Sequence, residues 1–238
     1  MKLTYIFHSG FALEFSEYSI LIDYFEDTEG QTGYVHDYLL KKESPLYILS
    51  THSHHDHFNK EILAWRKEKK DIIYIFSKDI LNESKAQETD AIYLDKLEIF
   101  SDKNIEIKTY GSTDLGISFY IKADNMTIFH AGDLNNWHWN EESTDKEIKE
   151  AEDFYQQELN IVSHDIKHLD LAIYPIDPRL GKDFMKGAKQ FIEAIRVDIL
   201  APMHFSSDPS RICAFEPIAY EHNCKYICWK NKGESIII

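Results

Sequence analysis

The chain has 238 residues, of which 43% are hydrophobic and 28% are charged, so it can bury a core without disulfide support. This composition excludes a disordered chain, a collagen-like chain and a small disulfide-rich scaffold. Lysine and arginine together number 26 and aspartate and glutamate 41, which gives a formal net charge of −15. Such a charge disfavours a nucleic-acid partner, because phosphate contacts need a cationic face.

Strand-like segments dominate the first half of the chain. Short runs rich in β-branched and aromatic residues, separated by turn residues, predict strands. These runs cover 3–7, 11–15, 19–23, 46–50, 72–76, 91–94, 105–110, 116–121 and 126–132. Two further strands are predicted in the second half, at 171–176 and 197–203.

Three helices are predicted between the strands from their capping residues. Asn59 can cap the first helix, and Thr144 with Glu147 matches a capping box for the second. Asp183 can cap the third, whose apolar residues fall at 184, 188, 191, 192 and 195. A chain that begins with many strands and then alternates strands with helices predicts two sheets covered by helices on their outer faces.

The ends of the chain and its cysteines bear on the cellular compartment. The segment before His8 carries one lysine and no apolar stretch, and no apolar run reaches membrane-spanning length. Cys213, Cys224 and Cys228 cannot all pair within the chain, and reduced thiols are the simpler expectation. Cys224 and Cys228 are expected to be buried, small apolar side chains. Since no linker or repeat interrupts the sequence, we expect one cytoplasmic domain over residues 1–238 without a membrane partner.

The segment THSHHDHF at 51–58 is the strongest functional signal. His52 and His54 stand two residues apart, so in extended backbone they point the same way. Asp56 and His57 follow in a tight turn and can face a second point. Three imidazoles and a carboxylate suit Zn²⁺, Fe or Mn²⁺, and loops at strand ends are where sites are built. The alternative is a histidine-rich surface loop, which this spacing disfavours.

These residues resemble the HxHxDH signature of the metallo-β-lactamase-fold superfamily. HAGD at 130–133 and PMHF at 202–205 resemble its later strand-end motifs, in the same chain order. FHSGFALEF followed by ILIDYF resembles the lactonase-like branch. The resemblance covers nearly the whole chain and implies an α/β fold, a four-layer αββα sandwich, with a metal site at one edge between the sheets.

The resemblance also implies a set of ligands and a cofactor. The implied ligands are His52 and His54 for a first metal, Asp56, His57 and His204 for a second, and Asp133 as the bridge. The implied cofactor is a divalent metal, one or two ions, with Zn²⁺ expected first and Mn²⁺ or Fe as alternatives.

One residue departs from the family pattern. The superfamily's first metal takes a third histidine, whereas Ser112 stands at that position and no histidine occurs between Phe58 and Phe129. A serine hydroxyl is a poor Zn²⁺ ligand beside imidazole. Three outcomes stay open at this stage. The first site is empty or weak, or water and Asp114 complete it, or His130 or His138 substitutes for the missing ligand.

Four residues are candidates for contact with a substrate, and each has a structural alternative. His8 resembles a histidine near the pocket of the lactonase-like branch, against a purely structural role. Trp137 and Trp139 flank His138 just after the bridging aspartate and could wall a pocket or lie in the core. Arg179 could clamp a carboxylate or phosphate, or pair internally with Asp177. The predicted substrate-binding residues are His8, Trp137, His138 and Arg179.

These features predict a metal-dependent hydrolase. A bound metal lowers the pKa of water from 15.7 to about 7, and the resulting hydroxide attacks a carbonyl or phosphoryl centre. Asp56 or Asp133 would orient that water and pass a proton to the leaving group. By analogy with the lactonase-like branch, the expected substrate is a small ester or lactone, anionic compounds included, with phosphoesters as the second class.

Two other functions remain open from the sequence. The missing histidine is compatible with a non-catalytic metal-binding or ligand-sensing protein. A nuclease-like member of the superfamily would need a basic strip near the site. The lysines and arginine at 60–70 lie on a predicted helix whose exposed face explains them equally well.

Overall fold

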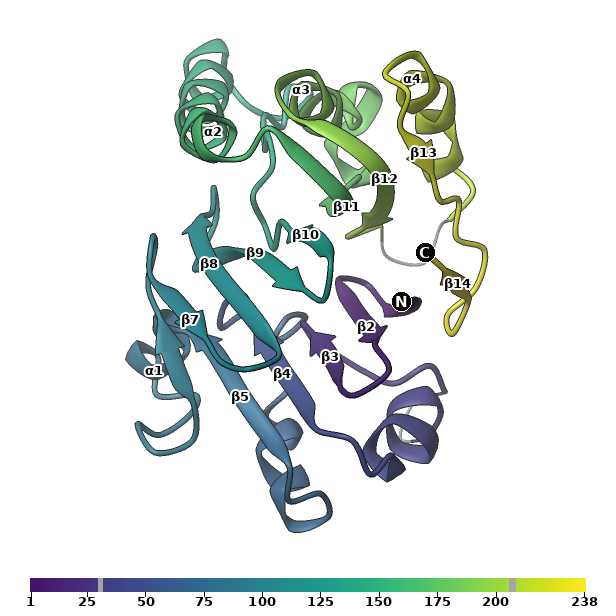
Figure 1. Ribbon diagram of the computed structural model, residues 1–238. Helices are drawn as coiled ribbons and strands as arrows, with labels where there is room; N and C mark the ends of the chain where they lie inside the picture. The colour runs from purple at the N-terminus through teal and green to yellow at the C-terminus, as the bar shows by residue number, and fades with distance from the viewer. Residues whose placement is uncertain (30–31, 206–208) are drawn as a thin grey trace. The chain divides into compact units, whose positions relative to one another are not determined.

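The computed structural model describes residues 1–29, 32–205 and 209–238, and the chain divides into two compact units. Unit 1 comprises Met1–Asp95 and Trp229–Ile238, and unit 2 comprises Lys96–Cys228. Each unit is built on one seven-stranded mixed sheet with its own helices (Figure 1). The assignment of residues 1–238 to one domain stays a prediction.

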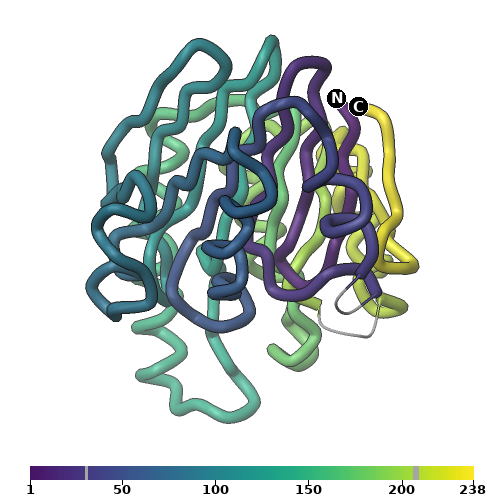
Figure 2. Tube along the Cα trace, turned by 90° about the horizontal axis from the view of Figure 1, so that it is seen from below, coloured from purple at the N-terminus to yellow at the C-terminus, as the bar shows by residue number. Residues whose placement is uncertain are grey.

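The sheet of unit 1 combines antiparallel and parallel strands. Its members in spatial order are β14 (Ser235–Ile237), β1 (Lys2–Phe7), β2 (Gly10–Glu14), β3 (Ser19–Ile22), β4 (Leu46–Ser50), β5 (Ile72–Ser77) and β6 (Ile92–Leu94). Pairing is antiparallel from β14 to β3 and parallel from β3 to β6. The two chain ends meet at the β14 edge, where the Met1 amino group donates to the Ile238 carbonyl at 3.0 Å (Figure 2).

Short helices cover one face of this sheet. They are η1 (Tyr34–Tyr38), η2 (Leu39–Lys41), η3 (Lys60–Lys67) and α1 (Lys78–Asn82). Val35, Leu39, Ile62 and Trp65 from these helices are buried in one cluster with side chains of β1 to β5. The predicted cap is confirmed, because the Asn59 side chain accepts from the Glu61 amide at 3.0 Å, although the helix is of the tighter 3₁₀ kind.

A buried acid ties η1 and η2 to the sheet. Glu14 of β2 accepts hydrogen bonds from the Tyr38 hydroxyl at 2.8 Å, from the Lys42 ammonium at 2.7 Å and from the Tyr34 hydroxyl. Burial acts to raise the pKa of Glu14, but these partners and Lys2 outweigh it and lower the pKa from 4.5 to about 2. Glu14 is therefore ionised at neutral pH and stabilises this end of unit 1.

The sheet of unit 2 is antiparallel at one end and parallel at the other. Its members in spatial order are β13 (Lys225–Tyr226), β12 (Arg196–Met203), β11 (His168–Pro175), β10 (Met126–His130), β9 (Ile117–Ala123), β8 (Ile105–Gly111) and β7 (Ile99–Ser101). The strands from β10 to β13 are parallel. The carboxyl ends of β10, β11 and β12 therefore lie at the same edge, which is where parallel sheets place their sites.

The helices of unit 2 confirm one predicted cap and correct another. The capping box of Thr144 and Glu147 starts α2 (Asp145–Asp165), as predicted. α3 (Lys186–Ala194), however, follows Met185, and Asp183 does not cap it. Asp183 instead ends η4 (Pro178–Asp183), a 3₁₀ segment broken at Gly181, where φ is +80°. η5 (Ile212–Phe215) and α4 (Glu216–Glu221) complete the unit.

The cysteines differ from the expectation of three reduced thiols. Cys213 of η5 and Cys228 form a disulfide with a Cα–Cα distance of 5.3 Å, a separation typical of such bonds. The fold brings together two residues 15 positions apart, which spacing did not reveal. Cys224 is a buried thiol as predicted, and burial raises its pKa to about 12. Across the described residues, no helix is both long and apolar enough to span a membrane.

Candidate metal centre

A buried aspartate organises the histidine loop of unit 1. Asp23 follows β3 and accepts from the Thr51 amide at 2.7 Å and the Thr51 hydroxyl at 2.6 Å. His57 presents Nδ1 to the same carboxylate at 2.8 Å. Since an ionised carboxylate only accepts, Nδ1 of His57 carries the proton and Nε2 carries the lone pair that a metal needs.

His52 and His54 have the spacing of two ligands on one ion. Nε2 of His52 lies 3.1 Å from Nδ1 of His54. Two imidazole nitrogens on a tetrahedral Zn²⁺, each at 2.0–2.1 Å, stand about 3.4 Å apart. The Thr51 hydroxyl lies 3.1 Å from Nδ1 of His52, so the ring is held from its other side. The predicted orientation of these two histidines toward one point is thus seen within unit 1.

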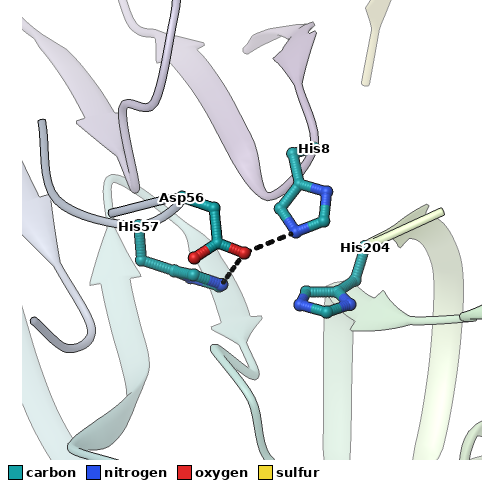
Figure 3. Close-up of side chains that lie close together, drawn as sticks. All are labelled: His8, Asp56, His57 and His204. Atoms are coloured by element: carbon teal, nitrogen blue, oxygen red, sulfur yellow. Dashed lines mark ion pairs between the residues drawn. The ribbon is translucent and has the colours of Figure 1, made fainter. Parts of the chain in front are cut away.

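A second group in unit 1 consists of His8, Asp56 and His57, whose ligand atoms lie within 4.8 Å of one another. Nε2 of His8 is 3.2 Å from Oδ2 of Asp56, and Nε2 of His57 is 4.0 Å from the same oxygen (Figure 3). Burial acts to raise the pKa of Asp56, but the hydrogen bond from His8 outweighs it and holds that pKa well below its usual value. Asp56 is therefore a carboxylate at neutral pH.

The β1–β2 turn that carries His8 needs a glycine. A Cβ at Gly10 would lie 2.9 Å from the carbonyl oxygen of Phe7 and 3.1 Å from that of Asp23. The Phe7 contact is closer than Cβ atoms show and the Asp23 contact is tighter than most, so the turn leaves no room for a side chain at position 10. His8 itself has φ +55°, and its amide donates to the Tyr5 hydroxyl at 3.1 Å.

In unit 2, one polar residue of interest lies shortly beyond the carboxyl end of each of three parallel strands. Asp133 follows β10, Asp177 follows β11 and His204 follows β12. The Ala131 amide donates to Ile173, and the Ile176 amide donates to Met203, both at 3.0 Å. These bonds extend the pairing of the strands past their ends and fix the three side chains at one edge of the sheet.

His204 is held between two carboxylates. Its Nδ1 lies 2.9 Å from Oδ2 of Asp177, and its Nε2 lies 3.4 Å from Oδ1 of Asp133. Burial acts to raise the pKa of Asp177, but the hydrogen bonds from His204 and Arg179 hold it well below its usual value. Nδ1 of His204 therefore donates to Asp177, and Nε2 is the nitrogen that faces Asp133. The 3.4 Å between Nε2 of His204 and Oδ1 of Asp133 equals the spacing of about 3.4 Å expected for two ligand atoms on one tetrahedral ion.

Ser112 and Asp114 form a turn. The Asp114 amide donates to the Ser112 hydroxyl at 3.2 Å, which is a serine turn. A carboxylate oxygen of Asp114 also lies within 4.8 Å of one of Asp133. Unit 2 can thus offer two carboxylates at this point in place of the missing imidazole.

His130 and His138 are poorly placed as substitute ligands. His138 is buried, with Nε2 at 3.2 Å from the Asp183 carbonyl and Nδ1 accepting from the Asn140 amide at 3.2 Å. His130 is fully buried, and its Nδ1 accepts from the Gly132 amide at 3.2 Å. His138 was also predicted to bind substrate. Its two hydrogen-bonded ring nitrogens and its burial in unit 2 explain why it does not line the cavity described next.

A cavity of about 310 Å³ opens beside Asp133 and His204 in unit 2. The predicted substrate residues Trp137, Trp139 and Arg179 line it. The internal pair of Arg179 with Asp177 also exists, with Nη2 of Arg179 at 2.6 Å from Oδ2 of Asp177. The internal pair is therefore confirmed, and the contact of Arg179 with a substrate carboxylate or phosphate stays a prediction, although the side chain lines the cavity.

Backbone strain is concentrated at these residues. Eight described non-glycine residues have positive φ, and half of them belong to the groups above: His8, Asp23, Trp139 and His204. Such conformations cost about 1–3 kcal/mol each and persist where the surroundings over-determine them, commonly at functional sites. Three of the four follow a strand directly, where a left-handed residue re-aims the side chain.

Asp23 and Asp177 are the residues that sequence reasoning missed as positioning groups. Both are fully buried, and each holds Nδ1 of one predicted histidine ligand. The available signal was an acidic residue shortly after an apolar strand, which is weak on its own, whereas Asp133 was singled out by the HAGD motif and its place in the motif order. The donor set of each unit fits a divalent metal, since its nitrogens and carboxylates have ligand-like spacing and its key imidazoles are oriented by carboxylates.

Comparison with known proteins agrees with this reading. A curated relative, a UPF0173 metal-dependent hydrolase from Desulforamulus reducens, is 25% identical over 237 residues, covering 93% of this chain and 90% of the relative. Igni18, described as a novel metallo hydrolase from Ignicoccus hospitalis, has a similar fold with a TM-score of 0.68 at 18% identity, covering 99% of this chain and 97% of Igni18.

A third similar structure is CmlA, a diiron β-hydroxylase from Streptomyces venezuelae. Its TM-score is 0.68 at 13% identity, and the match covers 100% of this chain but 54% of CmlA. These likenesses, with two mixed sheets and flanking helices in the chain, confirm the predicted αββα sandwich. The family model described as the beta-lactamase superfamily domain matches residues 2–152, more than half of the chain. The chain therefore belongs to the beta-lactamase superfamily domain family.

Proposed function

We propose that this metal-dependent hydrolase acts on small esters or lactones, with phosphoesters as the second substrate class. Family membership and the names of the relatives support hydrolysis that depends on a metal. By resemblance to the family, the order of the motifs that contain His52, His54, Asp133 and His204 implies that these residues take part in one reaction.

The observation that carries the proposal is the orientation of two imidazoles. Nδ1 of His57 donates to Asp23, and Nδ1 of His204 donates to Asp177, both to fully buried carboxylates. This arrangement fixes the ring, selects the tautomer and raises the basicity of Nε2, as in metal-binding histidines generally. A histidine that only packs in the core does not need a buried carboxylate on its Nδ1. Both His57 and His204 have one.

A bound divalent ion would supply Lewis acidity and bring the pKa of a coordinated water toward about 7. The chain's own residues supply the proton transfers. Asp56 is held as a carboxylate by His8 and His57, so it can accept a hydrogen bond from an attacking water and orient it. Asp133, next to the cavity, is placed to pass a proton to a leaving oxygen.

We propose Zn²⁺ as the first candidate metal, because imidazole and carboxylate donors in these numbers suit it. Fe and Mn²⁺ remain the alternatives, and CmlA is a diiron enzyme. The carboxylates of Asp114 and Asp133 would favour the harder ions, since no third imidazole is offered where Ser112 stands.

A polyanionic substrate is disfavoured by the charges around the cavity. Among the described residues that line it, Arg179 is the one cation and Asp114 and Asp133 are carboxylates, so the lining can match one negative charge but not several. Combined with a net charge of −15, this arrangement would repel a nucleic acid before contact.

The test is a panel of reactions on protein stripped of metal and reloaded separately with Zn²⁺, Mn²⁺ and Fe²⁺. Phenyl acetate, small lactones and an aryl phosphodiester represent the three substrate classes. We expect turnover of an ester or lactone that disappears with chelator and in Asp133→Ala and His54→Ala. His164→Ala removes an exposed histidine and is the matched control. Tight metal binding with no turnover of any class would instead favour the non-catalytic metal-binding protein.

A further inference from the structure

The cavity of unit 2 is small and its lining is divided by chemistry. Its volume of about 310 Å³ is at the lower end of ligand pockets, which span about 300–1,000 Å³. Two tryptophans form an apolar wall, one arginine provides a cation, and Asp133 with His204 forms the reactive end, while Thr113 and Asp114 complete the described lining. A site divided in this way distinguishes ligands by shape and by charge.

The apolar wall consists of parallel indoles joined to the reactive end. The rings of Trp137 and Trp139 are stacked with centroids 6.3 Å apart and an interplanar angle of 14°. The centroid of the Trp137 ring lies 5.3 Å from the centroid of the His204 ring. Nε1 of Trp137 donates to the Asp133 carbonyl at 2.8 Å. A flat group placed along these indoles would therefore lie next to the predicted metal ligands.

The burial and backbone conformation of Trp139 are unlike those of a core tryptophan. It is half-buried, and its φ of +41° is a left-handed conformation that an aromatic residue rarely adopts. The amides of Glu142 and Ser143 both donate to its carbonyl at 2.9 Å and hold the backbone there. A strained, half-buried indole that lines a cavity fits a ligand-stacking surface better than a core position.

Arg179 provides a cation of fixed orientation. Its Nε lies 2.9 Å from one carboxylate oxygen of Asp177 and 3.0 Å from the other, which sets the plane of the guanidinium. The side chain is nevertheless 56% exposed and lines the cavity. A planar guanidinium held in this way recognises a carboxylate with little loss of freedom.

We infer that this cavity selects small planar compounds that carry a carboxylate. The planar part stacks on Trp139 and Trp137, and the carboxylate contacts Arg179. The scissile bond then lies toward Asp133 and His204. That the selected compound is a substrate, an aryl or unsaturated cyclic ester or lactone, rests on the proposed function. The selectivity of the cavity can be measured without turnover.

The experiment compares three non-reactive probes by calorimetry on metal-loaded protein. Benzoate is planar and charged, benzamide is planar and neutral, and cyclohexanecarboxylate is charged and saturated. We expect benzoate to bind about tenfold more tightly than either of the others, the range of one charge-assisted or stacking contact. Arg179→Gln should abolish the benzoate–benzamide difference, and Trp139→Leu should abolish the benzoate–cyclohexanecarboxylate difference.

Controls separate these effects from folding and from metal ligation. Trp139→Phe retains an aromatic face and should keep most of the planar preference, whereas Phe154→Leu removes an exposed aromatic residue of α2 and should change nothing. Equal affinities of the three probes for the wild type would overturn the inference. So would a benzoate preference that survives in Arg179→Gln, since the carboxylate would then bind the metal and not the arginine.

The two proposals fail in different ways. Selective benzoate binding without turnover of any ester, lactone or phosphoester would overturn the proposed function and leave the selectivity of the cavity standing. Ester or lactone turnover with no preference among the three probes would support the proposed function and overturn this inference.

Discussion

Replacing Asp177 by asparagine removes one buried charge without changing the size of the side chain. Asp177 accepts from Nδ1 of His204 at 2.9 Å and from Arg179, and it lies outside the predicted ligand set. The amide offers one acceptor oxygen in place of two and has no charge. It can therefore no longer hold both the imidazole and the guanidinium as the carboxylate does.

The expected loss follows from the kind of bond that is removed. A hydrogen bond to a charged group contributes about 1.5–3 kcal/mol, and an outer carboxylate on a metal-binding histidine is worth about 10–100-fold in metal affinity. We therefore predict that Asp177→Asn raises the dissociation constant of the divalent ion about 10–100-fold.

The assay is a competition between the protein and a chromophoric chelator for Zn²⁺ at pH 7.5. Asp165→Asn is the matched control, because Asp165 also pairs with a histidine, His164, at 3.0 Å, but His164 is 87% exposed and the pair lies at the end of α2, outside the groups that could hold a metal. If Asp177→Asn folds normally and its Zn²⁺ affinity stays within about twofold of the wild type, the positioning role argued here is refuted.

The remaining predictions concern stability. Because folding lowers the pKa of Glu14 from 4.5 to about 2, its contribution of about 3 kcal/mol is complete above pH 4.5 and is lost as the pH falls toward 2. In urea unfolding, the unfolding free energy of Glu14→Gln should fall less between pH 4.5 and 2 than that of the wild type. Equal falls in the two proteins would contradict the network around Glu14. Cys213→Ser should lower the unfolding free energy by about 3 kcal/mol, the value for a 15-residue loop, and adding Cys228→Ser should cost little more. Phe191→Ala, in the fully buried core of unit 2, should cost about 3–5 kcal/mol, and a loss below 1 kcal/mol would mean that α3 is not packed as described.

Most elements and the close approach of His52 and His54 could be predicted because their signals are local. The run LYILS matches β4 residue for residue, and the spacing of His52 and His54 encodes their shared orientation. Asp133 and His204 were found only through motif order, since a lone aspartate or histidine after a strand has no local signature.

The rest depended on contacts between distant segments. Asp23 and Asp177 act through histidines 34 and 27 residues away, which no periodicity reports. β7, β13 and β14 have two or three residues each and are too short for a pattern to emerge. The Asp183 cap failed because Pro178 begins a 3₁₀ turn, capped by Asp177, which delays the start of α3.

The left-handed residues were also invisible in the sequence. Histidine is among the residue types enriched at positive φ, but nothing in the sequence marked His204 as left-handed. Trp139 is a residue type that rarely adopts positive φ, so the surrounding structure imposes it. At Trp139 local preference and the fold disagree, which is the behaviour expected of functional sites.

Elemental analysis of the purified chain after metal loading and dialysis shows whether these imidazoles and carboxylates hold divalent ions. We predict one or two equivalents of Zn²⁺, Mn²⁺ or Fe in the wild type, with a clear loss in His54→Ala and in His204→Ala. A wild-type chain that retains none of the three metals would contradict it.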